Sequence, residues 1–253
     1  MTPPNVTLIP VDGLPEVAEH DDLGRLIADA CAAQETPLAD GDVVVVTQKI
    51  VSKAEGRVAD LRGIEPSAQA RDFALTWEKD ARAIEVILRE AARVVRMEGG
   101  VLITETRHGF VCANSGVDAS NVGRGGDYVV LLPLDPDASA RGIRDALREA
   151  TGADVAVVVS DTFGRPWREG AINVAIGCAG IEPLLDYRGD VDSDGRELRS
   201  TVIAVADEIA AASELVMHKL HRVPAAIVRG YVYEKGDSGI RPVVREPGKD
   251  LFR

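Results

Sequence analysis

The stretch Val155-Ala-Val-Val-Val-Ser-Asp-Thr-Phe-Gly-Arg-Pro-Trp-Arg-Glu-Gly170 passes from five apolar residues into a polar, cationic segment. Residues 155–159 are mostly β-branched, which predicts a central strand covered on both faces. Ser160, Asp161 and Thr162 then place three oxygen-bearing side chains at the expected strand end. Such oxygens suit a hard cation such as Mg²⁺ or Mn²⁺, whereas turn capping by Asp161 or Thr162 explains the segment equally well.

Two arginines follow the tight turn that we expect at Gly164. Arg165 and Arg168 are spaced to hold an anion, because a guanidinium binds phosphate or carboxylate in a bidentate manner. Pairing with nearby acidic side chains is an alternative of equal weight. The segment therefore predicts a strand that delivers polar groups to a ligand site, with both arginines as candidate anion clamps.

The composition limits the class of protein. The chain has 253 residues, 45% of them hydrophobic, and a net charge of −12. It can therefore bury a large core, and its surface disfavours nucleic acid and anionic membranes as partners. No apolar run approaches the roughly 18 residues of a membrane helix, and no signal segment opens the sequence, so we expect a cytoplasmic protein. The scattered Cys31, Cys112 and Cys178 predict reduced, mostly buried thiols.

Strand and helix patterns alternate along the chain and indicate an α/β fold. Residues 172–181 are apolar without a clear period, and the acidic segment 186–197 is expected to be a loop. Strands are predicted at 5–11, 43–47, 101–104, 110–113, 128–132, 155–159 and 223–228, and helices at 22–31, 67–97, 135–151 and 201–220.

Polar residues also cluster directly after two other predicted strands. Segment 48–57 carries Lys49 and Lys53, and segment 114–121 carries Asp118. Loops beyond strand ends are where α/β sheets usually place ligands. The alternatives are ordinary surface lysines and an Asx turn at Asp118. The chain contains neither a Walker A loop nor a Gly-x-Gly-x-x-Gly motif, so any phosphate site is of another kind.

Two groupings with metal-like spacing are predicted not to bind metal. His218 and His221 lie three residues apart without a third ligand nearby, and we expect solvated side chains at a helix end. Asp190, Asp192 and Asp194 have calcium-like spacing, but the EF-hand pattern is not completed, which favours a solvated loop.

Five segments, taken in order, resemble the coenzyme F420-0:L-glutamate ligase family. They are Gly13-Leu-Pro-Glu16, Thr47-Gln-Lys-Ile-Val-Ser-Lys-Ala-Glu-Gly-Arg57, Asn114-Ser-Gly-Val-Asp-Ala-Ser-Asn121, Ser160-Asp-Thr-Phe-Gly-Arg165 and Val205-Ala-Asp-Glu-Ile-Ala-Ala-Ala212. The match covers nearly the whole chain. It implies a ligase that uses GTP to add L-glutamate to F420-0, or to its dehydro form, through a γ-glutamyl amide bond. An acyl phosphate would be the intermediate, with GDP and phosphate as products.

The resemblance also implies an architecture. The family has a mixed α+β, two-lobed fold, with mixed and antiparallel sheets flanked by helices. It forms an intertwined homodimer with a nucleotide and metal cleft. We expect residues 1–253 to be a single ligase domain of two closely packed lobes, without the nitroreductase-like domain that larger relatives carry.

Residue roles follow from the resemblance by motif position. Asp118 and Asp161 would bind a first divalent cation and Thr162 a second, either Mg²⁺ or Mn²⁺, and K⁺ is a further candidate cofactor. Lys53 would assist as a fixed cation, and to these roles we add, as a hypothesis of our own, Arg165 and Arg168 as anion clamps. Contacts to GTP are expected from Leu14, Pro15, Glu16, Val17, Gln48, Lys53 and Asn121, and from a glycine-containing loop at Gly236, Asp237 and Ser238.

Two other functions are compatible with the same residues. A metal-dependent nucleotide phosphatase would release phosphate from GTP without glutamate or a precursor. A non-catalytic GTP-binding scaffold would bind GTP tightly without turnover.

Overall fold

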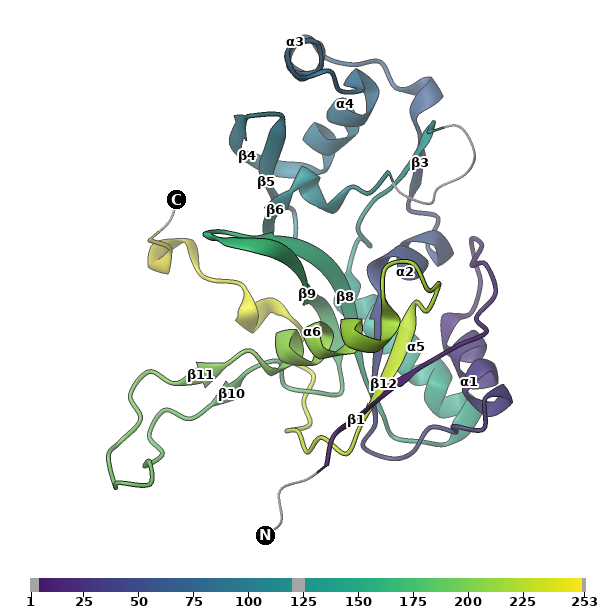
Figure 1. Cartoon of the computed structure of the whole chain (residues 1–253), viewed down its shortest axis with the longest axis vertical. Coiled ribbons are helices and arrows are strands. Elements are labelled where there is room, and N and C mark those ends of the chain that lie inside the picture. Colours follow the sequence, from purple (N-terminus) through teal and green to yellow (C-terminus); the bar gives the residue numbers. More distant parts are fainter. Residues whose placement is uncertain (1–4, 120–125, 252–253) are drawn as a thin grey trace.

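A five-stranded sheet forms the centre of the larger part of the molecule (Figure 1). The computed structural model describes residues 5–119 and 126–251. The sheet is mixed, because β2 and β8 run parallel and the other neighbours antiparallel, which confirms the mixed α/β class. Its strand order is β1 (Thr7–Pro10), β12 (Ala225–Arg229), β2 (Val43–Thr47), β8 (Ala156–Arg165) and β9 (Arg168–Ala179).

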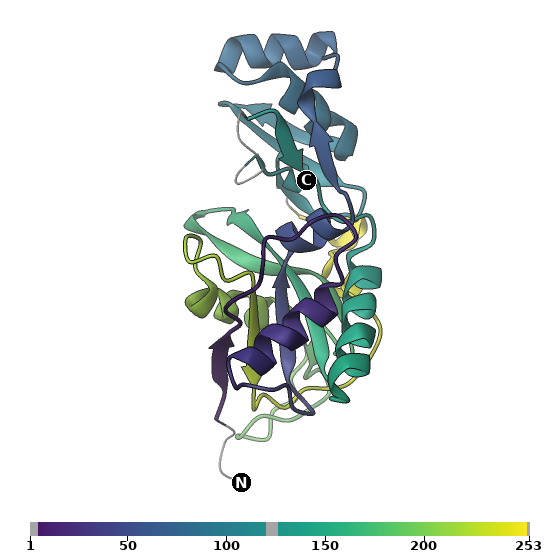
Figure 2. The same cartoon turned by 90° about the vertical axis from the view of Figure 1, so that its right-hand side faces the viewer.

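Helices cover both faces of this sheet. α1 (Leu23–Ala33) and α5 (Pro136–Thr151) pack side by side on one face, and α6 (Val205–Met217) lies on the other (Figure 2). The short helix α2 (Gln48–Ala54) directly follows β2. Val43–Val46 and Val157–Val159 are fully buried between these layers, so the valine runs form the centre of the core, as predicted.

The smaller part of the molecule has its own sheet and apolar cluster (Figures 1 and 2). β4 (Ala91–Glu98), β5 (Val101–Thr106) and β6 (Val111–Ala113) form an antiparallel sheet beside α3 (Ala68–Trp77) and α4 (Ala81–Glu90). β3 (Val58–Asp60) pairs with β7 (Tyr128–Val130). Elsewhere in the chain, β10 (Leu185–Asp186) pairs with β11 (Val202–Ile203) as a separate two-stranded sheet. Short 3₁₀ turns occupy Leu61–Gly63, Asn114–Gly116, Arg241–Val243 and Pro247–Lys249.

The prediction of a single helix over residues 67–97 is wrong, because this segment forms two helices and a strand. α3 ends at Trp77, its C-cap residue Glu78 adopts a left-handed conformation, and the Asp80 side chain caps a second helix, α4. From Ala91 onward the chain is strand β4. Apolar residues such as Val95 fit either period, and pairing with β5 decides between them.

The central strand is also longer than predicted. β8 continues through Ser160, Asp161 and Thr162 to Arg165 and pairs with β9, the segment whose type the sequence left open. The hairpin turns after Arg165, where Trp167 has a positive φ of 59°, so Gly164 lies in the strand and not in a turn. The helix predicted at 201–220 is α6, and it begins only at Val205 because Val202–Ile203 form β11.

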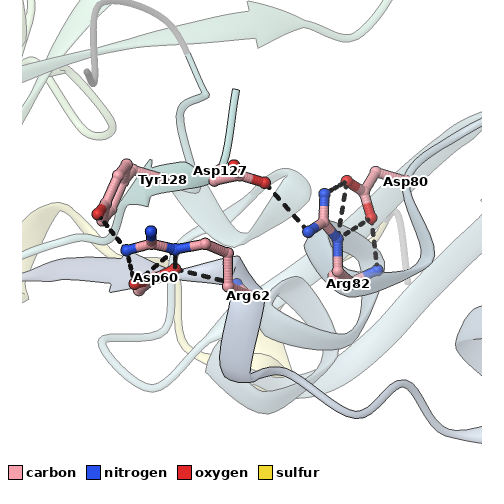
Figure 3. A network of polar contacts seen from close by, with 6 residues as sticks. All are labelled: Asp60, Arg62, Asp80, Arg82, Asp127 and Tyr128. Atoms are coloured by element: carbon pink, nitrogen blue, oxygen red, sulfur yellow. Dashed lines mark hydrogen bonds and ion pairs between the residues drawn. The ribbon is translucent and has the colours of Figure 1, made fainter. Parts of the chain in front are cut away.

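A network of polar contacts holds the start of β7 (Figure 3). Arg62 donates to the Tyr128 hydroxyl at 2.6 Å, and Arg82 donates to Asp127 at 3.1 Å. Asp60 and Asp80 complete the network by accepting from these two arginines. At its other end β7 exchanges two backbone hydrogen bonds with Asp118, through Val130. The network therefore supports the strand that positions the Asp118 backbone.

Other sequence expectations concern cysteines and membranes. Cys31, Cys112 and Cys178 are buried free thiols, as predicted. Within the described ranges, no helix has both the length and the apolar character needed to cross a membrane.

Close packing of β9 on the start of α5 gives a testable expectation. A Cβ at Gly177 would lie 2.4 Å from the Pro136 carbonyl oxygen, and Cys178 N donates to Asp137 at 2.8 Å in the same contact. Gly177→Ala should therefore destabilise the fold by about 1–3 kcal/mol, measured by urea unfolding. Gly164→Ala is the matched control, since nothing lies within 4 Å of its added Cβ. Equal stability of the two variants would contradict this packing.

Candidate active site

A cavity of about 1130 Å³ opens at the ends of β2 and β8. These neighbouring strands are parallel and their pairing ends at Thr47 and Ser160, so the residues after β2 and the outer half of β8 emerge at one edge of the sheet. Lys49 and Asp161 line the cavity from this edge, and Asp118 reaches it from the segment after β6. The polar clusters that follow three separate strands are thus brought together.

An ion pair joins the two parts of the molecule across this cavity. Lys49 Nζ lies 2.8 Å from Asp118 Oδ2. Both side chains are largely covered, with relative exposures of 22% and 34%. The ammonium group of α2 is therefore fixed beside one of the two carboxylates predicted to bind metal.

The second carboxylate, Asp161, is in an environment that disfavours its charge. Burial raises the pKa of Asp161 to about 6, and the negative charge of Asp118 acts in the same direction. The Thr162 backbone N–H, which donates to Asp161 at 2.8 Å, lowers this pKa, as do the charges of Lys219 and Lys49. A carboxylate whose pKa is raised by burial and by a neighbouring carboxylate is in an arrangement that a bound cation would relieve.

The donor set fits a hard divalent cation at Asp118 and Asp161. Both supply carboxylate oxygens, and the buried Ser160 Oγ beside them has no hydrogen-bond partner among the described residues. In residues 5–119 and 126–251, no group of three or more His, Cys, Asp or Glu side chains is arranged to hold a metal. A cation here would therefore complete its coordination with water, hydroxyl or phosphate oxygens, as Mg²⁺ commonly does.

Thr162 is held by a chain of hydrogen bonds along the cavity wall. Its hydroxyl donates to Asn173 Oδ1 at 2.8 Å, and Asn173 Nδ2 donates to Glu214 Oε2 at 2.9 Å. Lys219 Nζ donates to the Thr162 hydroxyl oxygen at 3.4 Å. Strand β9, helix α6 and the segment after α6 thus all contribute to the position of this hydroxyl.

The predicted nucleotide loop forms another wall. Leu14, Pro15, Glu16 and Val17 all line the cavity. The Glu16 carboxylate contacts the ammonium of Lys53 and lies 3.3 Å from Arg222 Nη2. The hydrogen bond from Lys53 lowers the pKa of Glu16, against a smaller opposing effect of burial. Lys53 is therefore in the predicted place, with a carboxylate as its present counter-ion.

Gln48 lines the cavity but has few free side-chain groups. The residue is 2% exposed, and its Nε2 donates to Ser52 Oγ at 2.8 Å and to the Leu131 carbonyl at 2.9 Å. Both amide hydrogens are thus used inside the protein. Any contact of Gln48 with a nucleotide would have to use its backbone or its side-chain oxygen.

Several predicted site residues are not gathered here. Arg165 donates to the carbonyls of Glu169 and Gly170 within its own hairpin, and neither it nor Arg168 lines the cavity. Asn121 lies outside the described residues.

The predicted C-terminal loop lies elsewhere on the molecule. Ser238 Oγ donates to Glu182 at 2.6 Å, and Asp237 pairs with Arg144 of α5 at 3.7 Å. Gly236 also packs directly against Glu182. These contacts place residues 236–238 against α5 and the segment after β9, away from the cavity of the same chain.

Sequence reasoning missed one wall of the cavity. Residues 218–220 and 222–224, which follow α6, line it together with Asn173, Glu214 and Met217. His218, Lys219, His221 and Arg222 make 218–222 a basic run in a chain of net charge −12. This basic run was the feature of the sequence that could have indicated a wall of an anion-binding cavity.

Comparison with known proteins identifies close relatives. The family profile for "F420-0:Gamma-glutamyl ligase" matches residues 13–230. The chain is 46% identical to "Coenzyme F420:L-glutamate ligase" of Methanothermobacter thermautotrophicus over 251 residues, covering 98% of this chain and 99% of the relative. It is 46% identical to the protein of the same name from Methanopyrus kandleri, covering 99% and 98%. A third relative of that name, from Methanocaldococcus jannaschii, is 42% identical and covers 93% and 91%.

Proposed function

The chain belongs to the F420-0:gamma-glutamyl ligase family and is a ligase, and on that premise we propose that it uses GTP to join L-glutamate to F420-0 or its dehydro form. The observation that supports GTP as the co-substrate is the cavity itself, which Asp118, Asp161, Lys49 and Lys53 all line. A paired carboxylate site with adjacent ammonium groups is what a metal–nucleoside triphosphate complex requires.

The proposed reaction proceeds in two steps. A carboxylate oxygen of the precursor attacks the γ-phosphorus of GTP, the bond to the β-phosphate oxygen breaks, and GDP leaves. The neutral amine of L-glutamate then attacks the acyl carbon, the bond to the phosphate oxygen breaks, and the amine loses a proton. Phosphate departs carrying one oxygen of the original carboxylate. Activation is needed because a free carboxylate has a poor leaving group.

The residues of this chain would bind and orient the reactants. Asp118 and Asp161 would hold a divalent cation, Mg²⁺ or Mn²⁺, which when bound neutralises phosphate charge. Lys49 fixes Asp118 through the ion pair across the cavity. Lys53 would bind phosphate in exchange for Glu16, whose carboxylate it now contacts.

An isotope experiment tests the acyl phosphate directly. The precursor carboxylate is labelled with ¹⁸O, and the phosphate released during the reaction with GTP, Mg²⁺ and L-glutamate is analysed by mass spectrometry. We expect one ¹⁸O atom in each phosphate that accompanies a new amide bond. Phosphate without the label would contradict carboxylate activation by GTP.

The same assay separates the phosphatase alternative. A nucleotide phosphatase would release phosphate from GTP at full rate when L-glutamate and the precursor are both omitted. The proposed ligase should release little phosphate under those conditions, since the acceptor carboxylate is missing.

A further inference from the structure

The turn that leads to Asp118 has an unusual backbone. Asn114, Ser115 and Gly116 have positive φ angles of 55°, 54° and 70°, and the Val117 backbone N–H closes the turn by donating to the Asn114 carbonyl at 2.9 Å. Residues other than glycine normally enter this left-handed region singly, because their Cβ crowds the following carbonyl oxygen. Such a turn persists only where its surroundings hold it.

Two buried hydroxyl groups hold this turn. The Thr104 hydroxyl of β5 accepts from the Ser115 backbone N–H at 2.8 Å and also lies 2.8 Å from Ser115 Oγ. Because Ser115 Oγ donates to the Ile87 carbonyl of α4 at 3.0 Å, Thr104 is the donor between the two hydroxyls. A longer contact of 3.4 Å joins the Thr104 hydroxyl to the Cys112 carbonyl. Thr104 and Ser115 are 0% and 2% exposed, so water cannot replace these bonds.

The position of Asp118 depends on this turn, which it follows by two residues. Its backbone exchanges hydrogen bonds of 2.9 and 2.8 Å with Val130, and its carboxylate meets Lys49 at 2.8 Å. Lys49 and Asp161 belong to the larger part of the molecule, whereas the turn, β5 and α4 belong to the smaller part. The turn therefore determines how the carboxylate of the smaller part is presented to Asp161.

We propose that Thr104 is a positioning residue for the cation site, because its hydroxyl holds the left-handed turn from which Asp118 reaches toward Asp161. Thr104 does not line the cavity and acts only through the turn. The inference rests on the metal site of the proposed function and goes beyond it, since it assigns part of the cation affinity to a buried hydroxyl outside that site.

Binding of Mn²⁺ alone tests the proposal without any turnover. Free Mn²⁺ is followed by electron paramagnetic resonance while the metal is titrated into the protein. Thr104→Val keeps the shape of the side chain but removes the hydroxyl, and its Kd for Mn²⁺ should rise by about tenfold. Thr104→Ser keeps the hydroxyl but loses a buried methyl group, so it should melt at a lower temperature and still bind Mn²⁺ as wild type does.

Thr106→Val is the matched control. Thr106 is also buried on the same face of β5, but its hydroxyl accepts from the Phe110 backbone N–H at 3.2 Å, in the connection to β6. This variant loses a buried hydroxyl that does not contact the turn at residues 114–116. It should therefore bind Mn²⁺ with the affinity of wild type.

Hydrogen exchange in wild type provides a second readout that does not depend on any variant folding. Because coupling between two sites is reciprocal, saturating Mg²⁺ should slow the exchange of the Ser115 amide. An unchanged exchange rate, an unchanged Mn²⁺ affinity in Thr104→Val, or an equal loss in Thr106→Val would overturn the proposal. A wild-type protein that binds no Mn²⁺ would instead refute the metal site of the proposed function, and this proposal with it.

Discussion

Asp161→Asn is expected to lower the rate of glutamylation by about 10³-fold, because it removes a charge that binds the cation at the reacting phosphate. Asparagine has the same shape as aspartate and can still accept from the Thr162 backbone N–H. The buried carboxylate is not a source of stability, since burial and Asp118 disfavour its charge. The fold should therefore be retained.

The measurement is initial rate under saturating GTP, Mg²⁺ and L-glutamate, together with a thermal melt. Asp190→Asn makes the same chemical change on the exposed loop and should leave the rate unaltered. A rate for Asp161→Asn within about twofold of wild type would show that the carboxylate has no part in transition-state stabilisation.

Arg229→Leu is expected to cost about 3–5 kcal/mol of folding free energy, because it leaves a buried carboxylate without its counter-ion. Asp42 is 1% exposed at the start of β2. Arg229, at the end of the neighbouring strand β12, binds both of its oxygens, with Nε at 2.9 Å and Nη2 at 2.7 Å. Loss of this pair should lower the melting temperature by about 10 °C.

An exposed pair of the same geometry provides the control. Arg188 binds both oxygens of Asp186, but both side chains are open to solvent, with exposures of 59% and 44%. Arg188→Leu should be close to wild type in a urea melt, because exposed pairs contribute little. If the two arginine variants were equally stable, burial of Asp42 would not be the determining factor.

The sequence predicted the part of the site that depends on strand ends. The valine runs before Thr47 and Ser160 indicated buried strands, and in the structure these strands are parallel neighbours in register. Lys49 and Asp161 therefore meet at one edge of the sheet, because both come just after the last paired residues of two parallel strands.

Long-range packing determines two features that the sequence pattern did not predict, the end of α6 and the contact of Asp207. The helical pattern of α6 continues to Leu220, yet the helix stops at Met217 and the next residues fold into the cavity wall. Asp207, in the first turn of α6, accepts from the Ala175 backbone N–H of β9 at 2.9 Å. Local periodicity contains no information on either contact, since both partners are distant in sequence.

The length of strand β8 explains why the two arginines lie outside the cavity. Arg165 and Arg168 follow the strand that carries Asp161, but β8 does not end there, so the hairpin carries both arginines past the cavity. Their expected role as anion clamps stays a prediction, as does the nucleotide role of residues 236–238, which lie against Glu182.

Product mass after incubation with GTP, Mg²⁺, L-glutamate and F420-0 is the most direct test of the central claim. We expect the coenzyme to gain a glutamyl residue, and the gain to disappear when GTP is omitted. A product of unchanged mass, under conditions in which the Methanothermobacter thermautotrophicus relative is active, would contradict the proposed function, as would a gain that does not depend on GTP.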